Sequence, residues 1–144
     1  MKKIEGDCVL SRHEENIALA QSVYDCGFAS DWTRMETLLC DEFEIVEPAG
    51  LPFGGAYYGK DALKRVFGSV FDALQPSDVR FKSMTANECQ VVSLLDLVFG
   101  SDEGEFIMPV AELFEIEGGK VKRMLPFFYD TAILDRFLAD RANA

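Results

Sequence analysis

The second half of the chain alternates apolar and polar residues over four long runs, and this period of two constrains the fold more than any other feature. Strand side chains point alternately to opposite faces, so such runs predict strands. The runs span residues 79–87, 89–99, 104–117 and 120–129, and the last three are separated by glycine-containing turns. Long strands joined by short turns pair with their neighbours in the chain. The sequence therefore predicts an antiparallel meander.

The first half of the chain has a mainly helical pattern. Apolar residues at spacings of three and four predict a helix over residues 13–29, and Asp31 is suited to cap a second, shorter helix. One strand then ends at Glu47, and a loop rich in proline and glycine leads to a third helix over residues 60–75. A final helix is predicted over residues 131–138. Helices followed by long strands predict an α+β fold in which a curved sheet wraps around the N-terminal helices.

Composition predicts one globular domain over residues 1–144, with a core over about residues 13–138. The chain has 144 residues, 49% of them hydrophobic, which is enough to form a core without disulfides. Its formal net charge of -11 disfavours nucleic acid and anionic membranes as partners, because both attract clustered lysine and arginine. No apolar run approaches the length of a membrane span. We therefore expect a soluble cytoplasmic protein.

Cysteine and histidine are too scattered for a metal site. The four cysteines, Cys8, Cys26, Cys40 and Cys89, form no Cys-x-x-Cys motif, and His13 is the only histidine. We therefore expect no protein-bound metal, no other cofactor, and reduced, buried cysteines. Proton transfer in this chain would depend on carboxylates and tyrosines.

Glu47 is an acid on an apolar strand face. Within residues 41–48 the alternation places it on the same side as Phe43 and Ile45. A carboxylate there either has a raised pKa, in the range useful for proton transfer, or binds a specific partner. The loop that begins at Pro48 would hold this acid at the rim of a pocket.

Two more acids lie on apolar faces by the same alternation. Asp96 and Glu112 belong to the second and third strands of the meander. We expect them to converge with Glu47 on a cavity between the sheet and the helices. Two alternatives remain open: each acid pairs with a basic residue such as Arg80 or Arg123, or the register differs by one residue and the acid meets solvent.

The predicted meander is apolar on both of its faces. Val92, Leu94 and Val98 share the face of Asp96, while Leu95 and Leu97 lie on the other. Helices would cover one face, and a second subunit is expected to cover the other. The sequence therefore predicts a homodimer that forms through the sheet.

Several motifs together resemble the nuclear transport factor 2-like superfamily. They are the Asp31 turn between two helices, residues 41–50, Gly59 at the start of a helix, residues 112–116 and residues 119–121. The closest likenesses are SnoaL-like polyketide cyclases and ketosteroid isomerases. The resemblance implies a cone-shaped fold with a curved mixed sheet. This scaffold hosts isomerases, cyclases, dehydratases, epoxide hydrolases and non-catalytic binders.

The resemblance to ketosteroid isomerases assigns roles to particular residues. Glu47 occupies the place of their aspartate base, and Glu112 that of the protonated acid in their oxyanion hole. Phe128 matches an aromatic residue that lines their pocket. Their oxyanion tyrosine aligns with Val23, so Tyr24, which faces inward in the helical pattern, lies one position away.

The resemblance to SnoaL-like cyclases points instead to Asp130, which matches their acid/base aspartate. An aspartate directly before a helix is also a common N-cap, so both roles remain open. The histidine that accompanies the cyclase aspartate has no counterpart here. The residues expected to line the substrate pocket are Trp32, Tyr58, Phe67, Phe71, Met108 and Phe128.

Together these patterns predict a cofactor-free enzyme that binds a small apolar carbonyl compound and moves a proton next to the carbonyl. Glu47 would be the base, and Glu112 or Tyr24 would bind the enolate oxygen. Asp96 and Asp130 are reserve candidates. The alternative is a non-catalytic module of the same fold that binds a small hydrophobic molecule or a protein.

Overall fold

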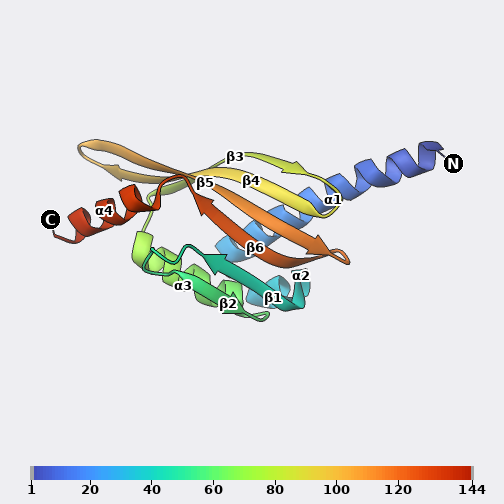
Figure 1. Ribbon diagram of the computed structural model, residues 1–144, viewed down its shortest axis with the longest axis horizontal. Coiled ribbons are helices and arrows are strands. Elements are labelled where there is room, and N and C mark those ends of the chain that lie inside the picture. Colours follow the sequence, from blue (N-terminus) through green and yellow to red (C-terminus); the bar gives the residue numbers. More distant parts are fainter. Residues whose placement is uncertain (1, 144) are drawn as a thin grey trace.

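The computed structural model describes residues 2–143, and their side chains from Arg12 onward. Ten helices and strands follow one another along this part of the chain (Figure 1). They are α1 (Lys2–Ala29), α2 (Trp32–Leu38), β1 (Leu39–Glu47), β2 (Gly55–Tyr58), α3 (Ala62–Leu74), β3 (Asp78–Ala86), β4 (Gln90–Ser101), β5 (Gly104–Glu117), β6 (Lys120–Phe128) and α4 (Thr131–Ala142).

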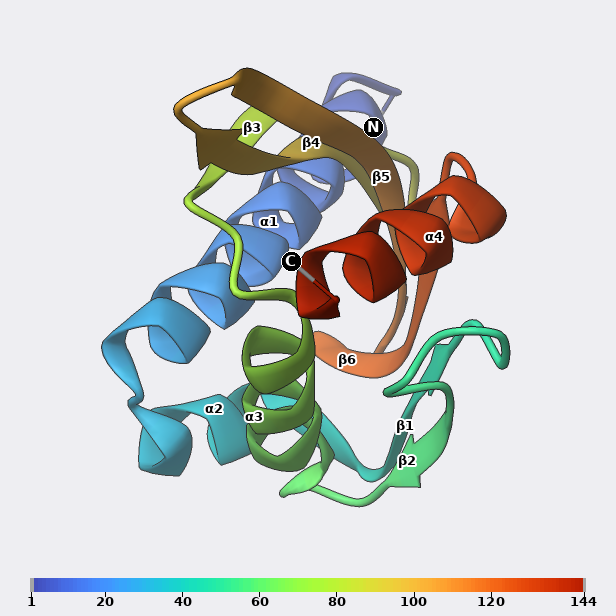
Figure 2. The same ribbon diagram turned by 90° about the vertical axis from the view of Figure 1, so that its left-hand side faces the viewer.

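The strands form one six-stranded mixed sheet in the order β2-β1-β6-β5-β4-β3. Strands β3 to β6 pair as the predicted antiparallel meander, while β1 joins β6 in parallel and β2 pairs with β1 in antiparallel fashion. The sheet curls around α1 and α3, which lie on its concave side (Figure 2). The predicted α+β cone is confirmed.

Strand β2 is the one strand that the sequence pattern does not predict. Its four residues lie in the segment assigned to a loop, and a strand this short is too brief to show a period of two. Gly54 makes the turn before it possible, because a Cβ atom at this position would lie 2.3 Å from the carbonyl oxygen of Pro48. The chain thus turns back on β1 and adds an edge strand beside the end that carries Glu47.

Helix α1 lies against α3 through a glycine. A Cβ atom at Gly27 would lie 2.4 Å from Cζ of Phe67, so only glycine lets the aromatic ring take this place. Phe67 in turn packs against Trp32 of α2, with ring centroids 5.7 Å apart. The three helices thus meet around the ring of Phe67.

Helix α4 covers the end of the sheet where β4 and β5 turn. Phe137 stacks on Phe106 with ring centroids 4.3 Å apart, and Leu134 is fully buried. Arg141 donates a hydrogen bond from Nη2 to the carbonyl oxygen of Ala73 at 3.0 Å, which ties α4 to the end of α3. One end of the cone is therefore covered by α4.

The cysteines differ in their burial. Cys26 is buried, and burial raises the pKa of its thiol, whereas Cys40 is half-buried. Cys89 is exposed, so the expectation of burial is wrong for this residue, which lies in the turn before β4. The side chain of Cys8 lies outside the described part of the chain. Within residues 2–143, no helix is long and apolar enough to cross a membrane.

Candidate active site

A cavity of about 100 Å³ lies between the concave face of the sheet and helices α1 and α3. Eighteen residues line it, and all but three are apolar. The three exceptions are Tyr24, Glu47 and Glu112. The cavity therefore combines a hydrocarbon wall with three groups that can carry an acidic proton.

Glu47 enters the cavity from the last position of β1. Phe43 and Ile45 precede it on the same face at 0% and 3% exposure, and Glu47 itself is 5% exposed. The alternation in the sequence is thus confirmed. The Oε2 atom of Glu47 is buried and has no hydrogen-bond partner among the described residues. Burial, and to a lesser extent the nearby carboxyl of Glu112, raises the pKa of Glu47 to about 8.

Glu112 lies on β5 and accepts a hydrogen bond from Tyr24 of α1. The distance between Tyr24 Oη and Glu112 Oε1 is 2.5 Å, short for a hydrogen bond between two oxygens. Glu112 is half-buried as a residue, but its carboxyl group lies among protein atoms. This burial raises the pKa of Glu112, and the Tyr24 hydrogen bond lowers it in part. Burial, followed by the charge of Glu112, raises the pKa of Tyr24, so the phenol keeps its proton.

The two acids lie at one level of the sheet. Glu112 is paired with Pro126 of β6, and β6 pairs in parallel with β1 through Ile45 and Met124. Two residues further along both strands, Glu47 lies beside Pro126. Strands are spaced by about 4.8 Å, so the backbones at Glu47 and Glu112 are roughly 10 Å apart. Two glutamate side chains at this separation can contact the same small molecule.

Ser93 belongs to the same level and was not predicted. It is paired with Glu112 across β4 and β5, is 0% exposed, and its Oγ has no hydrogen-bond partner in the described part of the chain. The hydroxyl lies close enough to Tyr24 to lower the pKa of that phenol. The signal in the sequence was a serine on a strand face otherwise occupied by Val91, Leu95 and Leu97.

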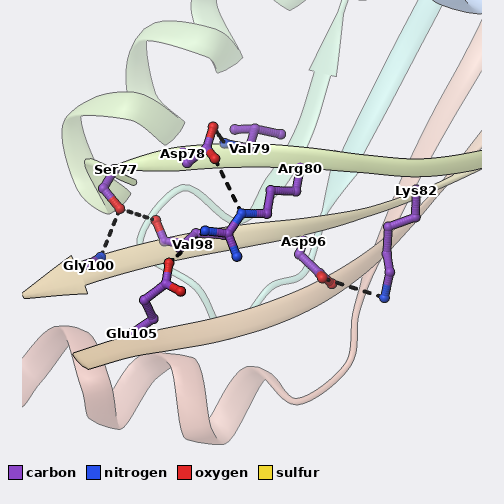
Figure 3. A network of polar contacts seen from close by, with 9 residues as sticks. All are labelled: Ser77, Asp78, Val79, Arg80, Lys82, Asp96, Val98, Gly100 and Glu105. Atoms are coloured by element: carbon purple, nitrogen blue, oxygen red, sulfur yellow. Dashed lines mark hydrogen bonds and ion pairs between the residues drawn. The ribbon is translucent and has the colours of Figure 1, made fainter.

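The basic residues proposed as partners for the acids bind elsewhere. Arg80 contacts Glu105 at 2.7 Å and Asp78 at 3.4 Å (Figure 3). Arg123 contacts Glu44 and Glu115, at 3.0 Å and 3.7 Å. Neither guanidinium lines the cavity. Glu47 and Glu112 therefore face the cavity without a cation from the lining residues.

Asp96 lies on the opposite face of the sheet, so its expected convergence with Glu47 is wrong. Its neighbours Leu95 and Leu97 line the cavity, and Asp96 points to the outer face. There it contacts Lys82, with 3.5 Å between Oδ2 and Nζ (Figure 3). Because β4 is apolar on both faces, alternation alone could not show which face was the inner one.

Asp130 caps helix α4 and does not line the cavity. Its side chain accepts a hydrogen bond from the backbone nitrogen of Ile133 at 2.9 Å. This is the usual geometry of an N-cap aspartate, which satisfies an amide at the start of a helix. Of the two roles left open by the sequence, the structure shows the cap.

Of the residues expected to line the substrate pocket, Phe67, Phe71 and Phe128 line this cavity. Trp32, Tyr58 and Met108 are not among its lining residues. Met108 is packed into the core at 2% exposure, while Tyr58 lies on edge strand β2 at 64% exposure. Trp32 packs against Phe67 and lines a separate hollow with Lys60 and Lys64. The lining residues that sequence reasoning did not single out include Phe28 and Phe81.

Comparison with known proteins identifies the family. A family model described as a SnoaL-like domain matches residues 20–124. The chain belongs to the SnoaL-like domain family. The predicted membership of the nuclear transport factor 2-like superfamily is thereby confirmed. No curated protein gives a significant match.

Several solved structures share the SnoaL-like fold at low sequence identity. Bal32a from a soil-derived mobile gene cassette has a TM-score of 0.73 and 16% identity, covering 88% of this chain and 98% of that one. TerC, co-crystallised with polyporic acid, has a TM-score of 0.72 and 19% identity, covering 87% and 98%. An NTF2-like protein from Burkholderia pseudomallei K96243 has a TM-score of 0.69 and 17% identity, covering 86% and 97%. These likenesses show the fold.

Proposed function

We propose that this SnoaL-like protein is a cofactor-independent enzyme that moves a proton on an uncharged, apolar carbonyl compound. The observation that supports the proposal is a pair of carboxyls in one apolar cavity. Glu47 and Glu112 both line it, and none of its lining residues is a cation. Acids in such surroundings have pKa values shifted toward neutrality, which suits general acid–base catalysis. Isomerases and polyketide cyclases are both found in this fold family.

The proposed reaction begins with the ionised carboxylate of Glu47. It takes a proton from the carbon next to the substrate carbonyl, and the electrons of the broken C–H bond move to the carbonyl oxygen. Burial raises the pKa of Glu112 and so favours its protonated form, whose Oε2 donates a hydrogen bond to the developing enolate. Tyr24 donates to the other oxygen, Oε1, and so fixes the carboxyl of Glu112 in position.

The enolate then has two possible fates. If the enolate is conjugated with a C=C bond of the substrate, Glu47 can return the proton to the far carbon of that bond, and the net result is isomerisation. If the enolate carbon instead attacks a second carbonyl of the same molecule, a new C–C bond closes a ring, the electrons of that C=O bond move to its oxygen, and the oxygen takes the proton held by Glu47, as in cyclase chemistry. In both cases the chemistry needs only a carboxyl that takes up and returns one proton and a neutral donor to oxygen.

The cavity volume restricts the part of the substrate that is enclosed. A cavity of about 100 Å³ is smaller than the engineered cavity of roughly 150 Å³ that binds benzene in another protein. One ring therefore fills the interior. Any larger substrate must extend past Phe28, Phe71 and Phe81, which are 52%, 38% and 45% exposed.

Hydrogen–deuterium exchange at the carbons next to the carbonyl of cyclohexanone tests the proposed chemistry. We expect the protein to accelerate exchange in D₂O, as followed by NMR, relative to buffer. Cyclohexanone that binds without accelerated exchange would instead support the alternative function, a module that binds a small hydrophobic molecule without turnover.

We also propose that a second copy of the chain covers the outer face of the sheet. Leu94, Ile107 and Phe127 are exposed there at 44%, 43% and 56%, and Ala111 links Leu94 to Phe127 across three strands. One apolar patch can bury itself against its own copy across a two-fold axis. Sedimentation should show a dimer that Phe127→Glu converts to a monomer, while Lys120→Glu has no effect. A wild-type monomer at micromolar concentration would contradict this proposal.

A further inference from the structure

The cavity is lined by an acid without a hydrogen-bond partner. Glu47 is 95% buried, since its exposure is 5%, and its Oε2 makes no hydrogen bond with any described residue. Glu112, by contrast, has Tyr24 as a partner. A buried carboxyl without a partner is unfavourable, particularly in its charged form. A ligand group that donates hydrogen bonds and carries positive charge would remove this cost.

The solvent-exposed part of the cavity lining is aromatic, since Phe28, Phe71 and Phe81 line the cavity and are exposed. Phe28 lies at the centre, with ring centroids 6.3 Å from Phe67, 6.3 Å from Phe71 and 6.1 Å from Phe81. Aromatic faces attract cations that approach within about 6 Å of the ring centroid, and they also pack against hydrocarbon. This lining therefore suits an apolar molecule that bears a cationic group.

We propose that the cavity binds hydrophobic primary amines as ammonium ions, with the ammonium group on Glu47 and the hydrocarbon part among Phe28, Phe67, Phe71 and Phe81. The ammonium group would donate hydrogen bonds to both oxygens of Glu47. Anions of the same shape would lose their hydration in an apolar cavity whose lining residues offer no cation, so they should be excluded. This binding uses the cavity of the proposed enzyme but requires no turnover, so it can hold whether or not the protein catalyses proton transfer.

The proposal predicts a particular exchange of protons. Burial raises the pKa of Glu47 to about 8, so most of this acid is protonated in the free protein at neutral pH. Binding of an ammonium ion therefore releases one proton from Glu47, and the affinity should rise about tenfold per pH unit until Glu47 is ionised in the free protein. The titratable groups that share the cavity with Glu47 are Glu112 of β5 and Tyr24 of α1. The lining residues from α3, β3, β4 and β6 are apolar.

The proposal is tested by isothermal titration calorimetry with three matched probes: cyclohexylmethylamine, cyclohexylmethanol and cyclohexanecarboxylate. At pH 7.5 we expect the amine to bind at least tenfold more tightly than the alcohol, and the carboxylate not to bind. Titration of the amine at pH 6.5 in two buffers of different ionisation enthalpy should show release of nearly one proton. The alcohol should release none.

Glu47→Gln should abolish the preference for the amine and leave binding of the alcohol intact, which also shows that the variant folds. Glu44→Gln, on the outward face of the same strand, should keep the preference. Equal affinities of amine and alcohol, or an amine preference that survives in Glu47→Gln, would overturn the inference.

The inference and the proposed function fail in different ways. Amine binding in the absence of accelerated ketone exchange would contradict the enzyme and leave the amine site intact. Accelerated ketone exchange with no preference for the amine would contradict the amine site and leave the enzyme intact. If none of the probes binds, the amine site is overturned.

Discussion

Glu47→Gln is expected to lower the rate of proton exchange on a bound ketone by about 10²–10⁴-fold, the usual contribution of a general base. Glutamine has nearly the same shape as glutamate but cannot accept the proton. The substitution breaks no described hydrogen bond, because Oε2 of Glu47 has no partner to lose. We therefore expect unchanged circular dichroism alongside the loss of activity, measured by NMR on cyclohexanone in D₂O.

Two further measurements separate the role of Glu47 from a general effect of removing an acid. Glu44→Gln changes an acid of the same strand on the opposite face and should keep the wild-type rate. In the wild type, the rate should rise with pH and level off above about 8, because only the ionised form of Glu47 acts as the base. If Glu47→Gln retains the wild-type exchange rate, Glu47 is not the base.

The free energy of unfolding is expected to fall as the pH rises from about 4.5 to about 8. The pKa of Glu47 is raised from 4.5 to about 8 in the folded protein. Between these values the folded state holds a proton that the unfolded state has released, so unfolding becomes easier by up to about 1.4 kcal/mol per pH unit. Burial of Glu112 acts in the same direction, because its pKa is also raised.

Urea denaturation at pH 5, 6, 7 and 8 measures this dependence. Glu47→Gln should be less sensitive to pH than the wild type across the whole range, and more stable than the wild type at pH 8. Below about 4.5 the advantage of the variant should vanish, since glutamate is then neutral in both the folded and the unfolded states. Parallel pH profiles for the two proteins would show that Glu47 does not titrate with a raised pKa.

The sequence placed Glu47 correctly because its strand has an unambiguous inner face. In β1, Phe43 and Ile45 are apolar while Glu42 and Glu44 are charged, so only one face could be buried. Asp96 was assigned to the wrong face because β4 is apolar on both faces. Which face is covered by helices depends on how the sheet curls, and a period of two does not contain that information.

The position of Tyr24 depended on tertiary packing as well. Resemblance to isomerases placed their tyrosine at Val23, whereas the structure brings both Val23 and Tyr24 to the cavity. A helix enclosed by a concave sheet buries a wide face, so adjacent residues can share one cavity. Gly27 contributes to this packing as well, because its lack of a side chain lets the ring of Phe67 pack directly against α1. Ser93 was missed because a single small polar residue in an apolar run carries little signal by itself.

The central claim is that Glu47 is a buried acid without a partner in a cavity shared with Glu112. The most direct test is a carbon-13 NMR titration of the glutamate carboxyl groups, with Glu47→Gln used to assign the signal of Glu47. The account predicts a midpoint near pH 8 for this signal. A midpoint near 4.5, the value of an ordinary glutamate, would contradict it.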